Sequence, residues 1–229
     1  MEKIKTIATD IPTRLEEILE TSWFIFTNQY INEKYAINLE APFQLHFATI
    51  LKLIGNAFCL KNREIFNVNL ETNMFIEKNN YVDIAISLFE QNSGREYCVP
   101  IELKYKTSKQ GAEDISSMEI YKDLKSLENL CYNYKKDNFE IPFAHLFFIT
   151  DSQRYVKKAK TGLRTLFRTD DGYKIEKGFE YKYLKTKTGR DFFDKYGAFV
   201  FNGSYKFNWS YFFKDPNYKR WFLKVKINR

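Results

Sequence analysis

The sequence contains little cysteine and little histidine. Its 229 residues include three cysteines, Cys59, Cys98 and Cys131, and two histidines, His46 and His145. The cysteines are isolated and odd in number, which argues against a disulfide framework and predicts buried thiols in a reducing compartment. Because there is no Cys-x-x-Cys pair and no histidine-rich stretch, nothing in the sequence indicates a zinc site.

Long apolar runs are also missing. No stretch approaches the roughly 20 apolar residues of a membrane span, and the first residues lack the apolar segment of a secretion signal. We therefore expect a cytoplasmic protein that does not associate with membranes. The sequence has no internal repeat, low-complexity tract or long linker. Its 229 residues are expected to form one domain, with a core at about 38–155 and a C-terminal extension at about 156–229.

Positive charge and aromatic residues are concentrated toward the C-terminus. The chain carries a net charge of +7 and contains 22 Phe, 16 Tyr and 3 Trp. Residues 1–150 contain 16 Lys/Arg and 21 Asp/Glu, whereas residues 151–229 contain 20 and 8, together with about half of the aromatic residues. Basic groups interleaved with aromatic rings suit phosphate contacts and base stacking. A lysine-rich solvated face over an aromatic core has the same composition, so this segment alone leaves both interpretations open.

The hydrophobic pattern switches between helical and strand periods along the chain. The expected elements are helices at residues 11–26, 42–60 and 117–135 and strands at residues 65–72, 81–87, 97–105 and 143–150. Asp10 is expected to cap the first helix, and Ser116 is expected to form a capping box with Glu119. The strand at 143–150 is apolar throughout, as parallel strands buried on both faces are. This order of elements predicts an α/β fold.

The basic C-terminal segment is expected to add β-structure to this core. A short strand at 198–201 is followed by Asn202-Gly203, a typical hairpin turn, and by a partner strand at 205–213. A last strand at 220–227 alternates apolar and basic residues. We therefore predict a basic, aromatic-rich C-terminal β extension.

Two of the expected strands carry charged residues that converge. Residues 91–95 between them have the Ser-Gly of a hairpin turn. Glu102 and Lys104 point to the same face of their strand because successive side chains alternate, and Asp83 lies on the preceding strand. Two carboxylates suit Mg²⁺, and a lysine beside them can orient or deprotonate a water or stabilise charge on a phosphate. The alternative is a surface ion pair on an edge strand.

The same residues resemble the PD-(D/E)xK nuclease superfamily. The matching segments are Val82-Asp83-Ile84 and Glu102-Leu103-Lys104, the latter after the apolar Val99-Pro100-Ile101. Val82 stands where the family often has a proline. The resemblance implies a restriction endonuclease-like core, with a mixed central sheet flanked by helices. It also implies hydrolysis of DNA phosphodiester bonds with Mg²⁺, for which Mn²⁺ can substitute.

The resemblance assigns roles to further residues. It implies a metal site formed by Asp83, Glu102, the backbone carbonyl of Leu103 and a third acid, either Glu40 or Glu71. Glu40 stands at the start of the second expected helix, where the helix dipole alone would favour an acid, and Glu71 ends the first expected strand. The residues expected to contact the substrate are Gln44, Lys106, Thr150 and Arg154.

Three other functions are compatible with the sequence. A binding module of the same fold would bind DNA without cutting it. A nuclease for RNA or single-stranded DNA would use the aromatic C-terminal segment to stack unpaired bases. An interaction protein would use the same aromatic residues to bind a partner protein. A homodimer is also left open, because many members of the resembled family cut duplexes as dimers.

Overall fold

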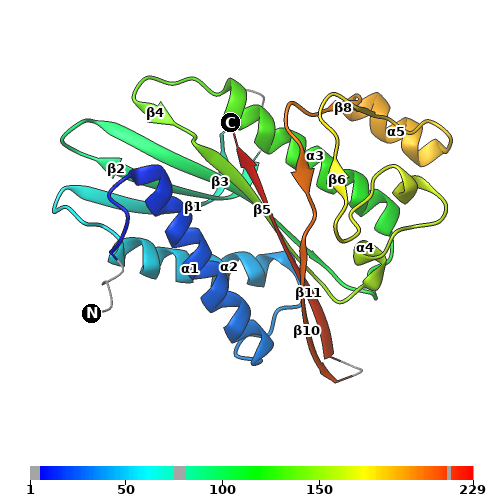
Figure 1. Cartoon of the computed structure of the whole chain (residues 1–229), viewed down its shortest axis with the longest axis horizontal. Helices are drawn as coiled ribbons and strands as arrows, with labels where there is room; N and C mark the ends of the chain where they lie inside the picture. The colour runs from blue at the N-terminus through cyan, green and yellow to red at the C-terminus, as the bar shows by residue number, and fades with distance from the viewer. Residues whose placement is uncertain (1–5, 75–80, 216–217, 229) are drawn as a thin grey trace. The chain divides into compact units, whose positions relative to one another are not determined.

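The computed structural model of the chain describes residues 6–74, 81–215 and 218–228 (Figure 1). The chain forms two compact units. The first comprises Met1–Ile101 and Tyr134–Pro142, and the second comprises Glu102–Asn133 and Phe143–Arg229. Each unit has a sheet with helices packed on it, and strand pairs of both orientations occur. The predicted α/β class, with a mixed sheet flanked by helices, is therefore confirmed.

Helices α1 (Ile11–Ile31) and α2 (Glu40–Ala57) pack against each other in the first unit (Figure 1). α1 begins where predicted, because the Asp10 side chain accepts a hydrogen bond from Thr13 N at 3.0 Å. The helix continues past its predicted end at residue 26. The buried ring of Phe26 stacks on the ring of Phe43 in α2, with centroids 5.0 Å apart. Aromatic packing therefore holds the two helices together.

The sheet of the first unit is a meander. Strand β1 (Glu64–Asn73) pairs antiparallel with β2 (Tyr81–Glu90), and β2 pairs antiparallel with β3 (Arg95–Lys106). The short β4 (Phe139–Glu140) pairs parallel with β3. Gly94 has a φ of 66° in the turn before β3, a conformation that glycine adopts readily. β3 runs through the unit boundary: its residues up to Ile101 belong to the first unit and the rest to the second.

A buried ion pair fastens α1 to the start of β1. The Arg14 guanidinium donates to both carboxylate oxygens of Glu64, each at 2.9 Å, and the two side chains are 1% and 0% exposed. Glu64 also accepts from the backbone N–H of Leu60 at 2.7 Å. Burial opposes ionisation of Glu64, but these hydrogen bonds outweigh it and lower its pKa below the usual value.

Helix α2 lies very close to β1. A Cβ atom added at Gly55 would come within 2.0 Å of a ring carbon of Phe66, whose side chain is buried in the core. Contacts this short do not occur between carbon atoms, so only glycine fits at this position without moving the ring or the helix.

Three strands of the second unit pair antiparallel with one another. Strand β5 (Phe143–Thr150) pairs with β11 (Tyr218–Asn228), and β11 pairs with β10 (Trp209–Asp215). The bounds of β5 are those predicted, and all eight residues are buried as expected for a strand covered on both faces; its pairing with β11 is antiparallel. Helix α3 (Glu113–Asn133) packs on β5 and β11.

The start of α3 also differs from the prediction. The helix begins at Glu113, and the Ser116 N–H donates to the Ala112 carbonyl at 3.0 Å. Ser116 is therefore already inside the helix and cannot cap it as proposed. Acidic residues in the first turn, Glu113 and Asp114, favour the earlier start because they interact with the positive end of the helix dipole.

Short elements complete the second unit. These are α4 (Gln153–Val156), η1 (Leu163–Thr165), β6 (Lys174–Ile175), β7 (Glu180–Tyr181), α5 (Lys187–Tyr196), β8 (Phe199–Val200) and β9 (Tyr205–Lys206). β6 pairs with β9 and β7 pairs with β8. The predicted hairpin between 198–201 and 205–213 is therefore wrong. The segment 205–213 is divided between β9 and β10, which pair with different strands.

A buried carboxylate on α3 holds the turn between β8 and β9. One oxygen of Glu128 accepts from the N–H groups of Asn202 and Gly203, both at 2.8 Å, and from the Tyr205 hydroxyl at 2.6 Å. The other accepts from Lys125 at 2.6 Å. Burial opposes ionisation of Glu128, but these donors outweigh it and lower its pKa.

In the part of the chain that the structure describes, no helix is both long and apolar enough to cross a membrane.

Candidate active site

Two acidic residues occupy opposed positions in the register of the first two strands. Leu70 of β1 pairs with Ile84 of β2, and Thr72 pairs with Val82. Glu71 and Asp83 are the residues between these pairs, so they occupy opposed positions. Glu71 has a φ of 46°, a left-handed conformation that is strained for a residue other than glycine. Strained backbone of this kind clusters at functional sites.

Gln44 of α2 joins the helix to both of these positions. Its Nε2 donates to Glu71 Oε1 at 2.9 Å and to the Asp83 backbone carbonyl at 2.6 Å. An amide nitrogen has two hydrogens, so both are used in these bonds. The sequence predicted Gln44 as a substrate contact. In the structure its side chain donates hydrogen bonds to residues of both β1 and β2. The geometry suits a residue that positions Glu71.

The two candidates for the third acid, Glu40 and Glu71, lie in different elements of the first unit. Glu40 is the first residue of α2 and is half-buried. It lies one helical turn before Gln44, so the two share a helix face. Glu71 is the candidate that Gln44 contacts, and it lies opposite Asp83 in the strand register. These contacts favour Glu71 as the partner of Asp83.

The other predicted residues lie on β3. Ile84 of β2 pairs with Ile101 of β3. In the chain, Asp83 directly precedes Ile84, and Glu102 directly follows Ile101. Within the second unit, Glu102 is 7% exposed and Leu103 is 1% exposed. A carboxylate as buried as that of Glu102 is unusual in a strand and is consistent with a functional role.

Lys104 makes an ion pair inside the second unit. Its Nζ lies 2.8 Å from Asp123 Oδ2 of α3, and both side chains are largely buried. Asp123 Oδ1 lies 3.2 Å from Lys122 Nζ. Burial opposes protonation of Lys122, but Asp123 outweighs it and raises the pKa of this lysine. Asp123 therefore holds two lysines.

Asp123 does not lie on a solvated face of its helix. Asp123 is only 6% exposed. It follows the buried Ile120 by three positions and precedes the buried Leu127 by four. This spacing places it on the inward face of a helix. The position of Asp123 in the apolar stripe was the signal that could have identified it from the sequence.

The remaining predicted substrate contacts lie in the second unit. Lys106 is half-buried at the end of β3. Thr150 is 1% exposed at the end of β5, and its hydroxyl accepts from Ser152 N at 3.0 Å. Arg154 in α4 lies with its Nη1 3.1 Å from Glu113 Oε1. The buried hydroxyl of Thr150 organises the turn after β5, whereas the Arg154 side chain is exposed.

The histidines and cysteines lie in core or half-buried positions. His46 stacks on Tyr35 at 4.0 Å between centroids, and His145 is fully buried in β5. All three cysteines are free, and Cys98 and Cys131 are buried as predicted. Burial raises the pKa of the Cys98 thiol. Among the described residues, no group of three or more His, Cys, Asp and Glu side chains is arranged to hold a metal ion.

Comparison of the chain with protein-family models, with curated proteins and with solved structures gave no match.

Proposed function

We propose that the protein is a Mg²⁺-dependent nuclease that hydrolyses phosphodiester bonds of DNA. The observation that carries the proposal is the opposition of Glu71 and Asp83 across β1 and β2, with Gln44 bonded to Glu71 and to the backbone of Asp83. The nuclease-like sequence pattern, Asp83 followed by Glu102-Leu103-Lys104, supports it independently.

The acid pair fits a divalent cation. Like charges directly opposite each other on neighbouring strands destabilise a sheet, and two adjacent carboxylates resist ionising together until a cation arrives. Glu71 is exposed and Asp83 is half-buried, so solvent and ions reach this position. Carboxylate oxygens are the ligands that Mg²⁺ prefers, and Mn²⁺ accepts the same set. The residues that would hold the ion are Asp83, Glu71, Glu102 and the carbonyl of Leu103.

The residues of the site would have separate roles. Bound Mg²⁺ would polarise the phosphoryl oxygen and lower the pKa of a coordinated water. Gln44 would fix the Glu71 carboxylate in one orientation. Lys104, paired with Asp123 at 2.8 Å, would donate hydrogen bonds to the phosphate or to the attacking water. Asp123 would position the ammonium of Lys104, because a fixed partner reduces the freedom of a long side chain.

Several coarser features belong to the same proposal. The order of two helices, a three-stranded meander, a helix and a strand supports a restriction endonuclease-like core. The excess of basic residues after residue 150 supports binding to nucleic acid. A cytoplasmic location rests on the isolated cysteines and the lack of long apolar runs. A defence or restriction role rests on the resemblance alone, and a homodimer stays an open alternative.

The test is a cleavage assay with matched acid variants. Supercoiled plasmid, single-stranded DNA and RNA are incubated with the protein in Mg²⁺, in Mn²⁺ and in chelator. We expect Asp83→Asn and Glu71→Gln to abolish metal-dependent cleavage. Glu40→Gln is the matched control for Glu71→Gln, since both remove one charge from a glutamate of the first unit. Gln44→Ala should reduce cleavage about 10- to 100-fold, as the loss of residues that orient metal ligands does.

Each outcome has a defined meaning. If Glu40→Gln abolishes cleavage and Glu71→Gln does not, the third acid is Glu40. If Asp83→Asn cleaves as well as the unmodified protein, the proposed site is wrong. If no substrate is cut while nucleic acid still binds, the protein is a binding module rather than an enzyme.

A further inference from the structure

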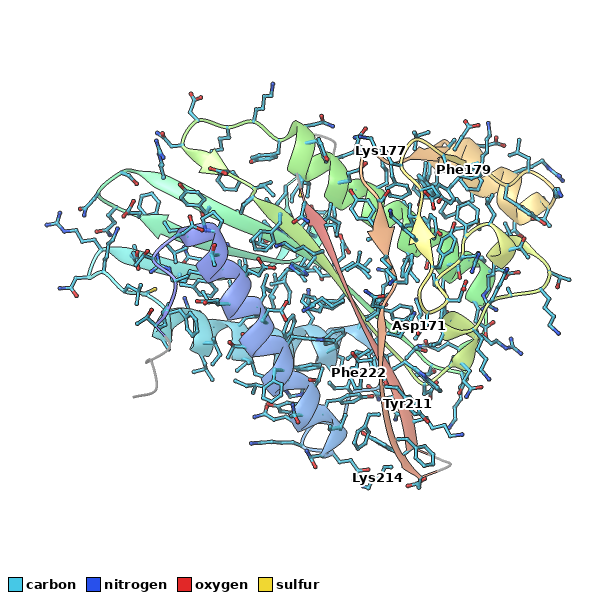
Figure 2. The ribbon with its side chains drawn as sticks, viewed as in Figure 1. Asp171, Lys177, Phe179, Tyr211, Lys214 and Phe222 are labelled. Carbon is cyan, nitrogen blue, oxygen red and sulfur yellow. The ribbon has the colours of Figure 1, made fainter. Side chains whose placement is uncertain are left out.

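Strands β10 and β11 form a two-stranded ribbon at the end of the second unit's sheet. We call the segment in which Trp209–Asp215 pairs with residues 218–223 the aromatic ribbon. Figure 2 shows Tyr211 and Lys214 toward its free end. In its register Tyr211 lies opposite Trp221, and Phe213 lies opposite Lys219.

One face of the ribbon is a row of nearly parallel rings. Tyr211 stacks on Trp221 with centroids 5.2 Å apart and an angle of 29° between their planes. Phe213 follows Tyr211 at 6.3 Å and 24°. Tyr211 is 54% exposed and Phe213 is 51% exposed. Two large rings that share one face and leave half their surface in water form an apolar platform, and such surfaces mark binding sites.

The base of the ribbon is fixed to the body of the second unit. The Trp209 indole N–H donates to the Thr169 carbonyl at 2.7 Å, and its backbone N–H donates to Asp171 Oδ1 at 2.9 Å. Its ring also packs edge-on against Phe148 at 5.2 Å. Trp209 is on the same face as Tyr211 and Phe213, because the three are every second residue of one strand. The exposed rings therefore continue a buried aromatic row, and their orientation is set before any ligand binds.

Positive charge surrounds the platform. Lys219 lies over the ring of Phe213, with Nζ 5.8 Å from the centroid. On the other face, Arg220 and Lys214 lie over Tyr218 at 4.4 Å and 5.6 Å. The whole segment 151–229 carries 20 basic and 8 acidic residues. A ligand of this ribbon should therefore offer flat apolar faces and negative charge together.

We propose that the aromatic ribbon binds single-stranded nucleic acid, with unpaired bases stacked on Tyr211 and Phe213 and a phosphate contacting Lys219 on the same face. This inference rests on the proposed function and names its substrate class. Every base has a π-face, so stacking of this kind tolerates any sequence. A duplex hides those faces inside its own stack. A second copy of the chain would bring two strongly basic segments together, which like-charge repulsion opposes.

The experiment measures binding in chelator, where no metal-dependent cleavage occurs. Fluorescence anisotropy follows a labelled single-stranded DNA and the duplex of the same sequence against the full chain. Stacking contributes about 1–3 kcal/mol per base, so Tyr211→Ala with Phe213→Ala should weaken single-strand binding at least about tenfold. Phe179→Ala is the matched control. Its ring is 49% exposed and lies at the other end of the second unit in Figure 2. Circular dichroism checks that each variant folds.

The basic residues have a separate readout. Each phosphate contact contributes about 0.7 to the slope of log affinity against log salt for single strands. Lys219→Ala should therefore lower the slope by about 0.7, while the two-ring variant should keep it.

The outcomes separate this inference from the nuclease proposal. Loss of single-strand binding in the ring variant, with Phe179→Ala unchanged, supports the inference whether or not any substrate is cut. Unchanged binding in the ring variant, or tighter binding of the duplex than of the single strand, overturns it. The inference is also overturned if the protein is a dimer by analytical ultracentrifugation, the ring variant is a monomer, and neither binds nucleic acid. The ribbon then binds a second copy of the chain. The nuclease proposal fails separately, when binding persists and no substrate is cleaved.

Discussion

His145 should make the second unit sensitive to mild acid. It lies in β5 between Phe143 and Phe147, with its ring stacked on Phe147 at 5.4 Å. Within the described residues, neither ring nitrogen has a hydrogen-bond partner. Complete burial, and then the positive charges of Lys224 and Lys226, lower the pKa of His145 from 6.5 to about 3. The folded protein therefore keeps this histidine neutral at every pH at which it is normally handled.

The size of the effect follows from the difference in pKa between the two states. The unfolded chain protonates His145 below about pH 6.5, whereas the folded chain does not until about pH 3. Over that window the unfolded state binds more protons, so stability falls as pH falls. Between about pH 7.5 and about pH 5, the linkage relation gives a loss of about 2 kcal/mol from this one residue.

The assay compares the protein with His145→Leu, which keeps an apolar side chain of similar size in the site. Urea unfolding is followed by tryptophan fluorescence in a Trp23→Phe background, so that the signal comes from Trp209 and Trp221 of the second unit. The free energy of unfolding is measured from about pH 7.5 down to about pH 5. Other titrating groups, including Glu128, are common to both proteins and cancel in the difference.

As the pH falls, we expect the free energy of unfolding of His145→Leu to rise steadily relative to that of the unmodified protein. The relative increase should reach about 2 kcal/mol at about pH 5. A difference that stays constant with pH would refute the reasoning, because it would mean that His145 ionises equally in both states. His145→Phe provides a second apolar substitution, should leucine leave a cavity.

Further predictions concern single contacts. Arg14→Ala should lower the free energy of unfolding by about 3–5 kcal/mol, because it leaves the Glu64 carboxylate buried and unpaired. Arg14→Met with Glu64→Leu should lower it much less. Urea unfolding of both variants and the unmodified protein tests this. Gly55→Ala should lower the free energy of unfolding by about 1–3 kcal/mol through the clash with Phe66, and an unchanged melting temperature would contradict this contact. Under the nuclease proposal, Asp123→Asn should reduce metal-dependent cleavage, because Lys104 loses the ion pair that fixes its ammonium, and unchanged cleavage would exclude a positioning role.

Much of the acid arrangement was readable from the sequence. The turn at residues 91–94, with its glycine, sets the register of β2 and β3, and period-two alternation identifies which residues share a face. Asp83, Glu102 and Lys104 could therefore be chosen as a group before any coordinates. The hydrogen bond from Gln44 to Glu71 could not be predicted, because its two residues lie 27 positions apart in the chain.

The C-terminal third shows where sequence patterns stop being informative. Alternation correctly indicated strands near residues 199, 205–213 and 220–227. It gave the wrong partners, because hydrogen-bonding groups are the same on every strand and only packing selects which strands meet. β10 pairs with β11, and Trp209 at its start is anchored to Thr169 and Asp171, about 40 positions earlier in the chain.

The sequence by itself determined the α/β class, most strand positions, the capped start of α1 and the charged pattern on β2 and β3, because these depend on local periodicity and turn chemistry. Only the tertiary structure decided that Asp123 is buried against Lys104, that Glu128 holds a distant turn and that Tyr211 and Phe213 stay exposed. The physical reason is that burial and ion pairing are set by what packs on a residue. Those neighbours come from parts of the chain that local sequence does not specify.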